Sequence, residues 1–467
     1  MMGRLAAPAR SLNANLESAI PGIAWPALPA APDAALLALL FRLGETEWWP
    51  AKRLREAQLA QVRALARHAH AHLPLQRDRM DACGLDPFAD FGWDEFARLA
   101  PMTREELQRA GPSAHLRGLT GHGAVVPTTG SGSTGRPVTF YSTAVAQRMW
   151  AALTLRDHLW HRRDFAEKLC VIRNRMTEAA LRDWGSPAVA MTATGPAATF
   201  PIEAPTARQV EWLVDERPGY LLTFPTNLEA LLRHCAERGV RIPNLKEVRT
   251  VAESLPRDLH ERCREVWGVP LTDTYSAREA GYIGLQCPAA PHYHVQSENV
   301  VVEIVRGDGT ACAPGEAGSV LLTVLSNFAT PLIRYEVGDI AVGGAPCACG
   351  RGLPVLERVV GRVRNMMTLP GGERRFPSFD SRFYGELGPV RQFQIVQKTE
   401  RLLELNVVSE RALTAAEEAA IKRRLLDRLQ QEFEVAIVPR DAIPRGPGGK
   451  YEEFMSEVAP AKTGAVR

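Results

Sequence analysis

Short β-like runs alternate with helical stretches from Lys168 onward, and this alternation constrains the fold more than any other feature of the chain. The strand-like runs include KLCVIR, GYLLTF, EVRTVAE and LTDTYS, and the helical stretches among them are NLEALLRHCAERG and RDLHERCREVWG. Strands joined through helices build a parallel sheet whose faces the helices cover. We therefore expect an α/β fold.

The sequence pattern changes after Gly361-Arg362, which places a domain boundary near residue 363. Upstream lies a β-rich region punctuated by glycine turns, NVVVEIVRGDGTACAPGEAGSVLLTVL. Downstream, the strand-like runs QFQIVQK, LLELNVV and FEVAIVPR flank a helical pattern, AAEEAAIKRRLLDRLQQ. A single core stops growing near ~250–300 residues, so a chain of 467 residues is expected to form more than one domain. We expect a large domain over residues 1–362, with βαβ layers and a β-rich subdomain, and a small, mobile α+β domain over residues 363–467.

The N-terminal part of the chain has a different character. Residues 1–32 are rich in Ala and Pro and are expected to be loosely ordered. From Leu54 to His72 the apolar residues recur at spacings of three and four in an Ala-rich stretch, which predicts a helix. This helix belongs to a helical lead-in over about residues 45–110.

Composition and charge exclude several classes of protein. A net charge of +3 is too small to indicate binding to nucleic acid or to an acidic membrane. No apolar run reaches the ~18 residues of a membrane span, and the N-terminus lacks the apolar core of a signal peptide. Eight cysteines in so long a chain do not indicate a disulfide scaffold. We expect a cytoplasmic enzyme, and leave open whether it is a homodimer.

A glycine-rich segment, TTGSGSTGRP at residues 128–137, is the strongest local indication of a binding site. Glycines allow the backbone to approach a ligand closely, and successive N–H groups in such a turn can converge on an anion. Hydroxyl groups add donors for a polyphosphate, here from Ser131, Ser133 and Thr134. The spacing matches neither a Walker P-loop nor a dinucleotide-binding turn. The alternative is a flexible linker, but a linker would not run directly into VTFY, which has the pattern of a buried strand.

Four further segments become informative beside this loop. Residues 273–281, DTYSAREAG, place an aromatic ring and a carboxylate close together, so that Tyr275 could stack on a base and Glu279 could hold Mg²⁺. The segment RYEVGD ends in Asp339, which could accept hydrogen bonds from a ribose diol. Gly361-Arg362 lies at the expected boundary, and Lys450 follows a pair of glycines near the C-terminus.

In this order, SGSTGRP, VAESLP, DTYSAREAG, YEVGD, GR and a late GGK resemble the motifs of the adenylate-forming superfamily of acyl-CoA ligases, carrier-protein adenylation domains and luciferases. Within it the chain is most similar to the phenylacetate–CoA ligase branch. The phrases PLIRYEVGDI and CACGRGLPVLERVVGR, and the N-terminal WWPAKRLREAQLAQVRALARHAHAHLPLQRD, are typical of that branch. The resemblance covers about residues 45–460.

The resemblance implies roles for individual residues. ATP phosphates would be wrapped by the loop Ser131, Gly132, Ser133, Thr134 and Gly135, and the adenine would be lined by Glu253, Ser254, Asp273 and Thr274 and stacked on by Tyr275. Asp339 would bind the ribose hydroxyls with help from Arg362, and Arg364 would stand at the hinge, where Asp or Lys is usual. The residues assigned to the chemistry are Lys450, Glu279 as the Mg²⁺ ligand, and Thr134. Arg136 and Ser133 depart from the usual Lys and Thr of the loop but keep the charge and the hydroxyl.

The implied reaction joins a carboxylic acid, expected to be aromatic or aryl-acyl, to AMP and then to the thiol of CoA. A carboxylate that attacks the α-phosphorus of ATP must overcome repulsion between anions, so cations carry most of the catalysis. In the family the small domain then rotates about its hinge, which withdraws the lysine and opens a path for the second nucleophile. Two alternatives remain at this stage: transfer of the adenylate to a carrier-protein thiol or an amine, and a degenerate nucleotide-binding relative, against which the retained Glu279, Asp339 and Lys450 argue.

The cysteines indicate a second, structural site. Cys287, Cys347 and Cys349 with one histidine form a set suited to tetrahedral zinc, since thiolates select zinc over harder ions. We choose His294 over His292 because similar sequences carry a histidine at that offset. Four protein ligands would leave no open position on the metal. The alternative is that Cys287 packs as a small apolar residue and Cys347-Ala-Cys349 is a turn with free thiols.

Overall fold

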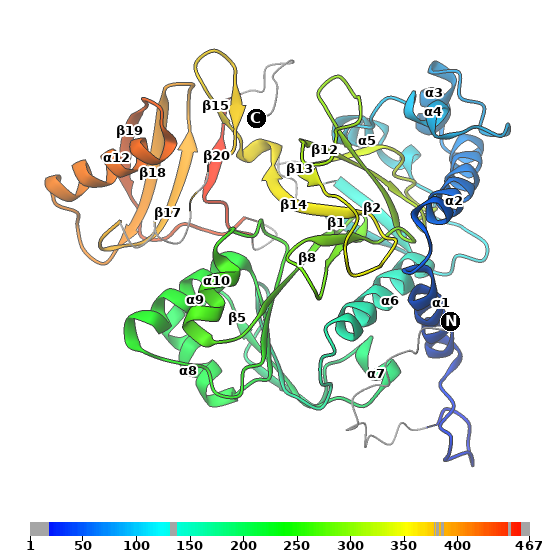
Figure 1. Ribbon diagram of the computed structural model, residues 1–467, viewed down its shortest axis with the longest axis horizontal. Coiled ribbons are helices and arrows are strands. Elements are labelled where there is room, and N and C mark those ends of the chain that lie inside the picture. The colour runs from blue at the N-terminus through cyan, green and yellow to red at the C-terminus, as the bar shows by residue number, and fades with distance from the viewer. Residues whose placement is uncertain are drawn as a thin grey trace.

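The computed structural model describes residues 18–130, 138–377, 387–446 and 450–458, together with Phe379 and Phe383. Within these residues, the largest element is a twelve-stranded sheet with the strand order β11-β12-β13-β14-β10-β9-β8-β7-β6-β3-β5-β4. Figure 1 shows this sheet as the body of the molecule, with a separate small sheet beside it. The expected α/β fold with a small α+β unit is confirmed.

One half of the large sheet is parallel. Its strands are β3 (Leu169–Arg173), β5 (Ala197–Pro201), β6 (Tyr220–Thr223), β7 (Glu247–Val251) and β8 (Leu271–Ala277). The short β4 (Ala179–Leu181) closes the edge antiparallel to β5. Strands β3, β6, β7 and β8 coincide with strand-like runs predicted from the sequence, whereas β4 and β5 were not predicted.

Helices cover both faces of this parallel half. On one face lie α8 (Thr206–Glu216), α9 (Pro225–Arg238) and α10 (Leu259–Trp267), whose apolar side chains form one core with the sheet. Side chains alternate along a strand, so Val248 of β7 points into that core while Glu247 and Arg249 point to the opposite face. There α6 (Ala144–Trp160) places Asp157 against Arg249. The α6 face of β7 is therefore charged where the other face is apolar.

The other half of the sheet is antiparallel. It consists of β9 (Gly281–Gln286), β10 (Tyr293–Val295), β11 (Val300–Val305), β12 (Ala317–Val324), β13 (Tyr335–Gly343) and β14 (Val355–Arg362). A separate hairpin, β1 (Val125–Gly130) with β2 (Val138–Thr143), brackets the glycine-rich segment, since Gly130 pairs with Val138. Val138 and Phe140 are buried, as predicted for a strand after the loop. Residues 131–137, which include Ser131 to Gly135 and Arg136, lie outside the described residues.

The N-terminal part of the chain is helical, and its first helix begins before the expected lead-in over residues 45–110. It contains α1 (Ala31–Thr46), α2 (Ala51–His72), α3 (Pro74–Ala82), α4 (Trp93–Ala97), α5 (Arg104–Ala110) and the 3-10 turn η1 (Gly111–Ala114); a short α7 (Ala188–Met191) follows later in the chain. Residues 18–30 contain no helix or strand. None of the helices in the described ranges is at once long and apolar enough to cross a membrane.

The small unit follows Arg362. A turn η2 (Val363–Asn365) and the short pair β15 (Met367–Thr368) and β16 (Arg374–Arg375) lead into a four-stranded sheet of order β19-β18-β17-β20. The strands are β17 (Val390–Gln397), β18 (Leu402–Ser409), β19 (Glu434–Pro439) and β20 (Phe454–Ser456), and α12 (Ala415–Leu429) packs on them. Thr414 and Glu417 form a capping box that begins this helix. Figure 1 shows this unit, coloured from yellow through orange to red, beside the large sheet.

Candidate active site

Two cavities meet at the carboxyl edge of the parallel strands, between the large sheet and the small unit. They share four lining residues, Ala252, Ser276, Arg362 and Lys450. Ala252 directly follows β7, and Ser276 lies near the end of β8. Open parallel sheets bind their ligands in a crevice outside the carboxyl ends of their strands, so the position is the expected one for a ligand site.

The first cavity contains the residues predicted to bind the nucleoside. Tyr275 donates a hydrogen bond of 2.7 Å from its hydroxyl to Asp339, and Arg362 approaches the other oxygen of that carboxylate at 3.4 Å. Asp339 and Arg362 are cross-strand partners on β13 and β14. Burial and the neighbouring Asp339 carboxylate raise the pKa of Tyr275 well above its ordinary value, so its hydroxyl stays protonated as a donor. Tyr275, Asp339 and Arg362, which come from three separate sequence motifs, are therefore in contact with one another through the Asp339 carboxylate.

Asp273 and Thr274 also line this cavity. The Asp273 carboxylate accepts hydrogen bonds of 2.6 Å from the hydroxyls of Thr250 and Tyr293. Burial raises its pKa to about 7 although both hydroxyl bonds lower it. The carboxyl group that the sequence assigns to the adenine is thus held firmly by the protein itself.

Glu253 joins the large sheet to the small unit. Its carboxylate accepts hydrogen bonds from the Thr226 hydroxyl at 2.7 Å and from the backbone N–H of Tyr451 at 2.7 Å. Arg445 approaches it at 3.2 Å. Ser254, the neighbour of Glu253, lines the same cavity. Because Tyr451 directly follows Lys450, the Glu253 carboxylate fixes the backbone beside the predicted catalytic lysine.

Lys450 is half-buried and lines both cavities. Burial, followed by the neighbouring Arg362, lowers the pKa of its ammonium group to about 8, while Asp339, Glu279 and Glu253 act in the opposite direction. The sequence places Lys450 after a pair of glycines, a position that does not by itself indicate burial. The structure instead places it between the two cavities, with charged groups of both signs around it; the glycines before it, at 448 and 449, lie outside the described residues.

The second cavity has a volume of ≈ 930 Å³, toward the upper end of the range for small-molecule sites. Glu279 lines this second cavity and is not among the lining residues of the first cavity, which contains Tyr275. Arg364 also lines the second cavity and forms an ion pair with Glu452 of the small unit. Burial and the nearby Arg362 lower the pKa of Arg364 to about 10, so it remains a cation near neutral pH. The predicted hinge residue thus contacts the segment that follows Lys450.

The predicted metal-ligand set is brought together in space. The ligand atoms of Cys287, His294, Cys347 and Cys349 all lie within 4.8 Å of one another. The Cys287 and Cys347 sulfurs are 3.8 Å apart, and the Cys349 sulfur is 3.3 Å from Nε2 of His294. Burial lowers the pKa of His294 to about 4, which leaves the imidazole neutral, the form that binds metals. Its other nitrogen, Nδ1, faces the Leu353 carbonyl oxygen at 3.4 Å. Both the residue types and the arrangement fit zinc.

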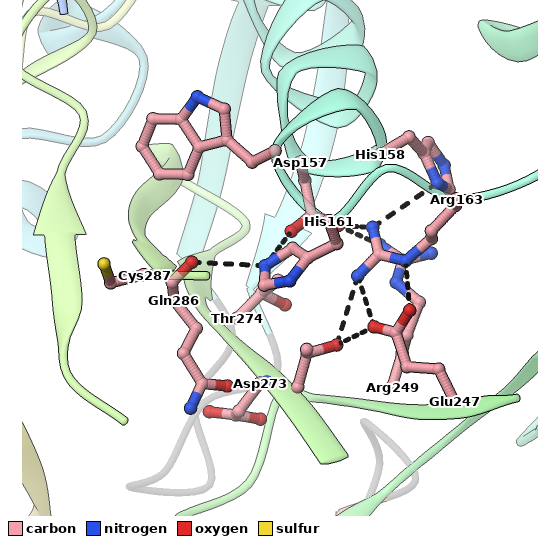
Figure 2. A network of polar contacts seen from close by, with 12 residues as sticks. Asp157, His158, His161, Arg163, Glu247, Arg249, Asp273, Thr274, Gln286 and Cys287 are labelled. Atoms are coloured by element: carbon pink, nitrogen blue, oxygen red, sulfur yellow. Dashed lines mark hydrogen bonds and ion pairs between the residues drawn. The ribbon is translucent and has the colours of Figure 1, made fainter. Parts of the chain in front are cut away.

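Several residues of the site were not predicted from the sequence. Thr226 and Arg445 contact Glu253 from segments with no recognisable motif. His158 and Arg249 lie in the wall of the second cavity and belong to a buried charged cluster (Figure 2). The available signal was the pair of charges in the otherwise apolar strand EVRTV, which a buried strand tolerates only with partners. Arg173 also lines the second cavity.

The chain is similar in sequence and structure to known ligases. It is 23% identical over 449 residues to a phenylacetate–coenzyme A ligase of Thermus thermophilus, an alignment that covers 88% of this chain and 98% of that protein. No family model matches the chain. A crystal structure of 2-hydroxyisobutyryl-CoA ligase in its postadenylation state superimposes with a TM-score of 0.67, at 21% identity over 89% of this chain and 92% of that one. The same ligase in its thioesterification state gives 0.56, at 21% identity over 88% and 91%. In sequence and fold the chain is thus similar to AMP-forming acid–CoA ligases of the adenylate-forming superfamily.

Proposed function

We propose that the protein activates a carboxylic acid with ATP, forming an acyl-AMP and pyrophosphate, and then transfers the acyl group to the thiol of CoA. One observation carries this proposal: the half-buried cation of Lys450 stands where the two cavities meet. The first cavity suits a nucleoside and the second an organic acid. A cation at their junction is where the carboxylate and the α-phosphate would have to approach each other, and where it would offset their repulsion.

Different residues of the first cavity bind the ribose and the base of the nucleoside. The Asp339 carboxylate, oriented by Tyr275 and Arg362, accepts hydrogen bonds from the ribose diol. The Tyr275 ring and the backbone around Glu253, Ser254, Asp273 and Thr274 surround the base. Residues Ser131 to Gly135, with Thr134 among them, would bind the phosphates from the connection between β1 and β2.

Glu279 is the carboxylate that would hold Mg²⁺. Bound there with phosphate oxygens, Mg²⁺ supplies neutralisation of the phosphate charge. The Glu279 side chain lines the acid cavity and is near enough to Lys450 to affect the pKa of that residue, so the two opposite charges stand at the same end of the cavity.

The two-step reaction assigns a function to the boundary after Arg362. We take residues 1–362 as the large domain and 363–467 as the small one, with Arg364 at the hinge. The segment around Lys450 contacts the large domain through Glu253, which accepts from the backbone of Tyr451 and pairs with Arg445. The higher TM-score with the postadenylation state than with the thioesterification state supports the assignment of this arrangement to the adenylation half-reaction. Rotation of residues 363–467 would remove Lys450 and admit the thiol.

Zinc at Cys287, His294, Cys347 and Cys349 has a structural function in this proposal. The cluster ties β10 to the segment between β13 and β14, and four protein ligands leave no place for a substrate. All eight cysteines are free of disulfides, which suits a reducing compartment such as the cytoplasm.

The test of the activity is a product analysis. Purified protein is incubated with ATP, Mg²⁺, CoA and a panel of aryl and aryl-acyl carboxylic acids, and the products are identified by mass spectrometry. We expect AMP, pyrophosphate and an acyl-CoA. ADP and phosphate as products would contradict the adenylation, and acyl-AMP that accumulates in the presence of CoA would contradict CoA as the acceptor.

A further inference from the structure

A cluster of buried charges lies under the acid cavity, away from Lys450. Arg163 is bound by two carboxylates, that of Asp157 at 2.7 Å and that of Glu247 at 2.7 Å, and Arg249 donates to Asp157 at 2.6 Å. Figure 2 shows Asp157 and Glu247 converging on Arg163, with Arg249 and His158 beside it. All five side chains are buried. Among them only Arg249 and His158 line the cavity.

The strand register gives the depth of this part of the cavity. Arg249 stands in register with Leu222 of β6, which is in register with Val171 of β3, and all three line the cavity. Ala252, which like Lys450 lines both cavities where they meet, follows Arg249 by three residues. At ~3.3 Å per residue along a strand, the two levels are about 10 Å apart. Arg249 and His158 therefore stand at the distal end of the cavity, opposite the reacting end.

Both residues offer hydrogen-bond donors there. One terminal nitrogen of Arg249 donates to Asp157, while Nε is buried and, like the remaining terminal nitrogen, has no acceptor among the described residues. Nδ1 of His158 faces Arg163 at 3.5 Å, and since arginine only donates, Nδ1 is the acceptor. Burial and the adjacent arginines keep His158 neutral by lowering its pKa, so its proton is on Nε2. The rest of this level is apolar, with Val171 and Leu222.

The charges of the cluster balance without a ligand. Asp157 and Glu247 offset Arg163 and Arg249, while His158 is neutral. A second carboxylate brought to this level would add an uncompensated buried charge, which is costly. A neutral oxygen of the substrate could accept hydrogen bonds from the Arg249 and His158 donors without disturbing the charge balance of the cluster.

We propose that Arg249 and His158 form a specificity subsite for the distal end of the substrate, and that the acid carries a neutral oxygen acceptor, such as a carbonyl, on the side of its ring away from the reacting carboxylate. This inference rests on the proposed acid activation and deepens it by naming the substrate class. A substrate without that oxygen leaves the Arg249 and His158 donors facing an apolar group, and sites with unmet donors reject such analogues strongly.

Pairs of acids that differ only in the acceptor test the inference. Benzoic, phenylacetic and 3-phenylpropanoic acids are each compared as the 4-acetyl and the 4-isopropenyl derivative, which have nearly the same shape but differ by a carbonyl oxygen and a methylene group. Pyrophosphate release gives kcat/KM for each acid. We expect the acetyl member of the best pair to be preferred by about tenfold or more. Equal use of both members, or preference for the isopropenyl one, overturns the inference while leaving acid activation intact. Absence of pyrophosphate with every acid overturns the proposed function, and the inference with it.

Two variants assign the preference to its residue. Arg249→Met keeps the length of the side chain and removes its donors, so the preference for the acetyl acid should fall to about twofold or less while the isopropenyl acid is still used. Thr272→Val is the matched control, because the Thr272 hydroxyl contacts Arg163 and Glu247 in the same cluster but does not line the cavity. This control should keep the preference. A folded Arg249→Met protein that keeps it, or a control that loses it, contradicts the assignment to Arg249; the wild-type comparison stands even if the variant does not fold.

Discussion

The Tyr275 hydroxyl and the Asp339 carboxylate meet at 2.7 Å, although β8 and β13 are separated in the sheet by β9, β10 and β14. Both residues line the first cavity. The Tyr275 hydroxyl holds one carboxylate oxygen, while Arg362 approaches the other. Asp339 therefore has a fixed orientation before any nucleotide arrives, and a preorganised acceptor loses less freedom when it binds.

Removing the Asp339 carboxylate should weaken nucleotide binding. In Asp339→Ala the ribose acceptor is lost and Tyr275 and Arg362 lose their shared partner, so we expect KM for ATP to rise by about tenfold or more. Steady-state kinetics at saturating acid measures it. Tyr275→Phe, which keeps the ring and the carboxylate, should raise KM less. A larger effect from Tyr275→Phe than from Asp339→Ala would contradict the assignment of Asp339 to the ribose.

Lys450→Ala should separate the two half-reactions. Loss of a preorganised cation at a developing charge costs roughly 3–4 kcal/mol, so acyl-AMP formation is expected to slow by about two to three orders of magnitude. Thioester formation from supplied acyl-AMP should fall far less, because the lysine is withdrawn in that step. The control is Lys422→Ala, on α12 of the same unit, which should leave adenylation unchanged. Equal losses in both half-reactions would show that Lys450 does not leave the site.

Adenylation should also depend on pH through Lys450. The pKa of its ammonium group is lowered to about 8, so it is a cation below that pH and loses its charge above it. We expect kcat/KM for the acid, which reports on the free enzyme, to fall as the pH rises through about 8. Arginine stays protonated at this pH, so Lys450→Arg should move or remove this alkaline decline whatever its effect on the maximal rate. An unchanged decline in Lys450→Arg would assign the titration to another group.

The sequence predicted the site's motif residues better than their connections. The parallel strands, α9, α10 and α12 follow from local patterns, and Tyr275, Asp339, Arg362 and Lys450 lie together as their motifs implied. The contacts of Glu253 with Arg445 and Tyr451 join residues about two hundred positions apart, and no local periodicity encodes such a pairing. Likewise Arg249 stands out as a charge in an apolar strand, but its partner Asp157 is on a helix far earlier in the chain. Long-range polar pairing is set by tertiary packing.

The cysteine cluster should contain metal. Elemental analysis of protein purified without chelator should find about one zinc per chain, and Cys349→Ser should lose it and lower the unfolding temperature, since structural zinc contributes to folding free energy. Cys312→Ser is the control, because Cys312 is a free thiol that is not part of the cluster. Wild-type protein without zinc, or zinc retained equally in both variants, would contradict the metal site.

The charged cluster beneath the acid cavity should be costly to interrupt. Burial acts to raise the pKa of Asp157, but Arg163 and Arg249 together lower it below its ordinary value, so the carboxylate is charged in the folded protein at neutral pH. Asp157→Asn keeps the shape of the side chain and leaves two buried guanidinium groups undercompensated, and removing one partner of a buried pair destabilises by roughly 3–5 kcal/mol. Because the folded-state pKa is the lower one, the stability that the carboxylate contributes is present above its unfolded pKa of about 4 and is lost as the pH falls below that value. Urea unfolding at pH 7 should therefore show the full difference in stability between wild type and variant, and the difference should shrink in acid.

The control is Arg306→Ala, which removes an exposed ion pair with Glu316 and should leave the urea midpoint at pH 7 essentially unchanged. Equal midpoints for Asp157→Asn and wild type at pH 7 would mean that the cluster does not hold β7 to α6.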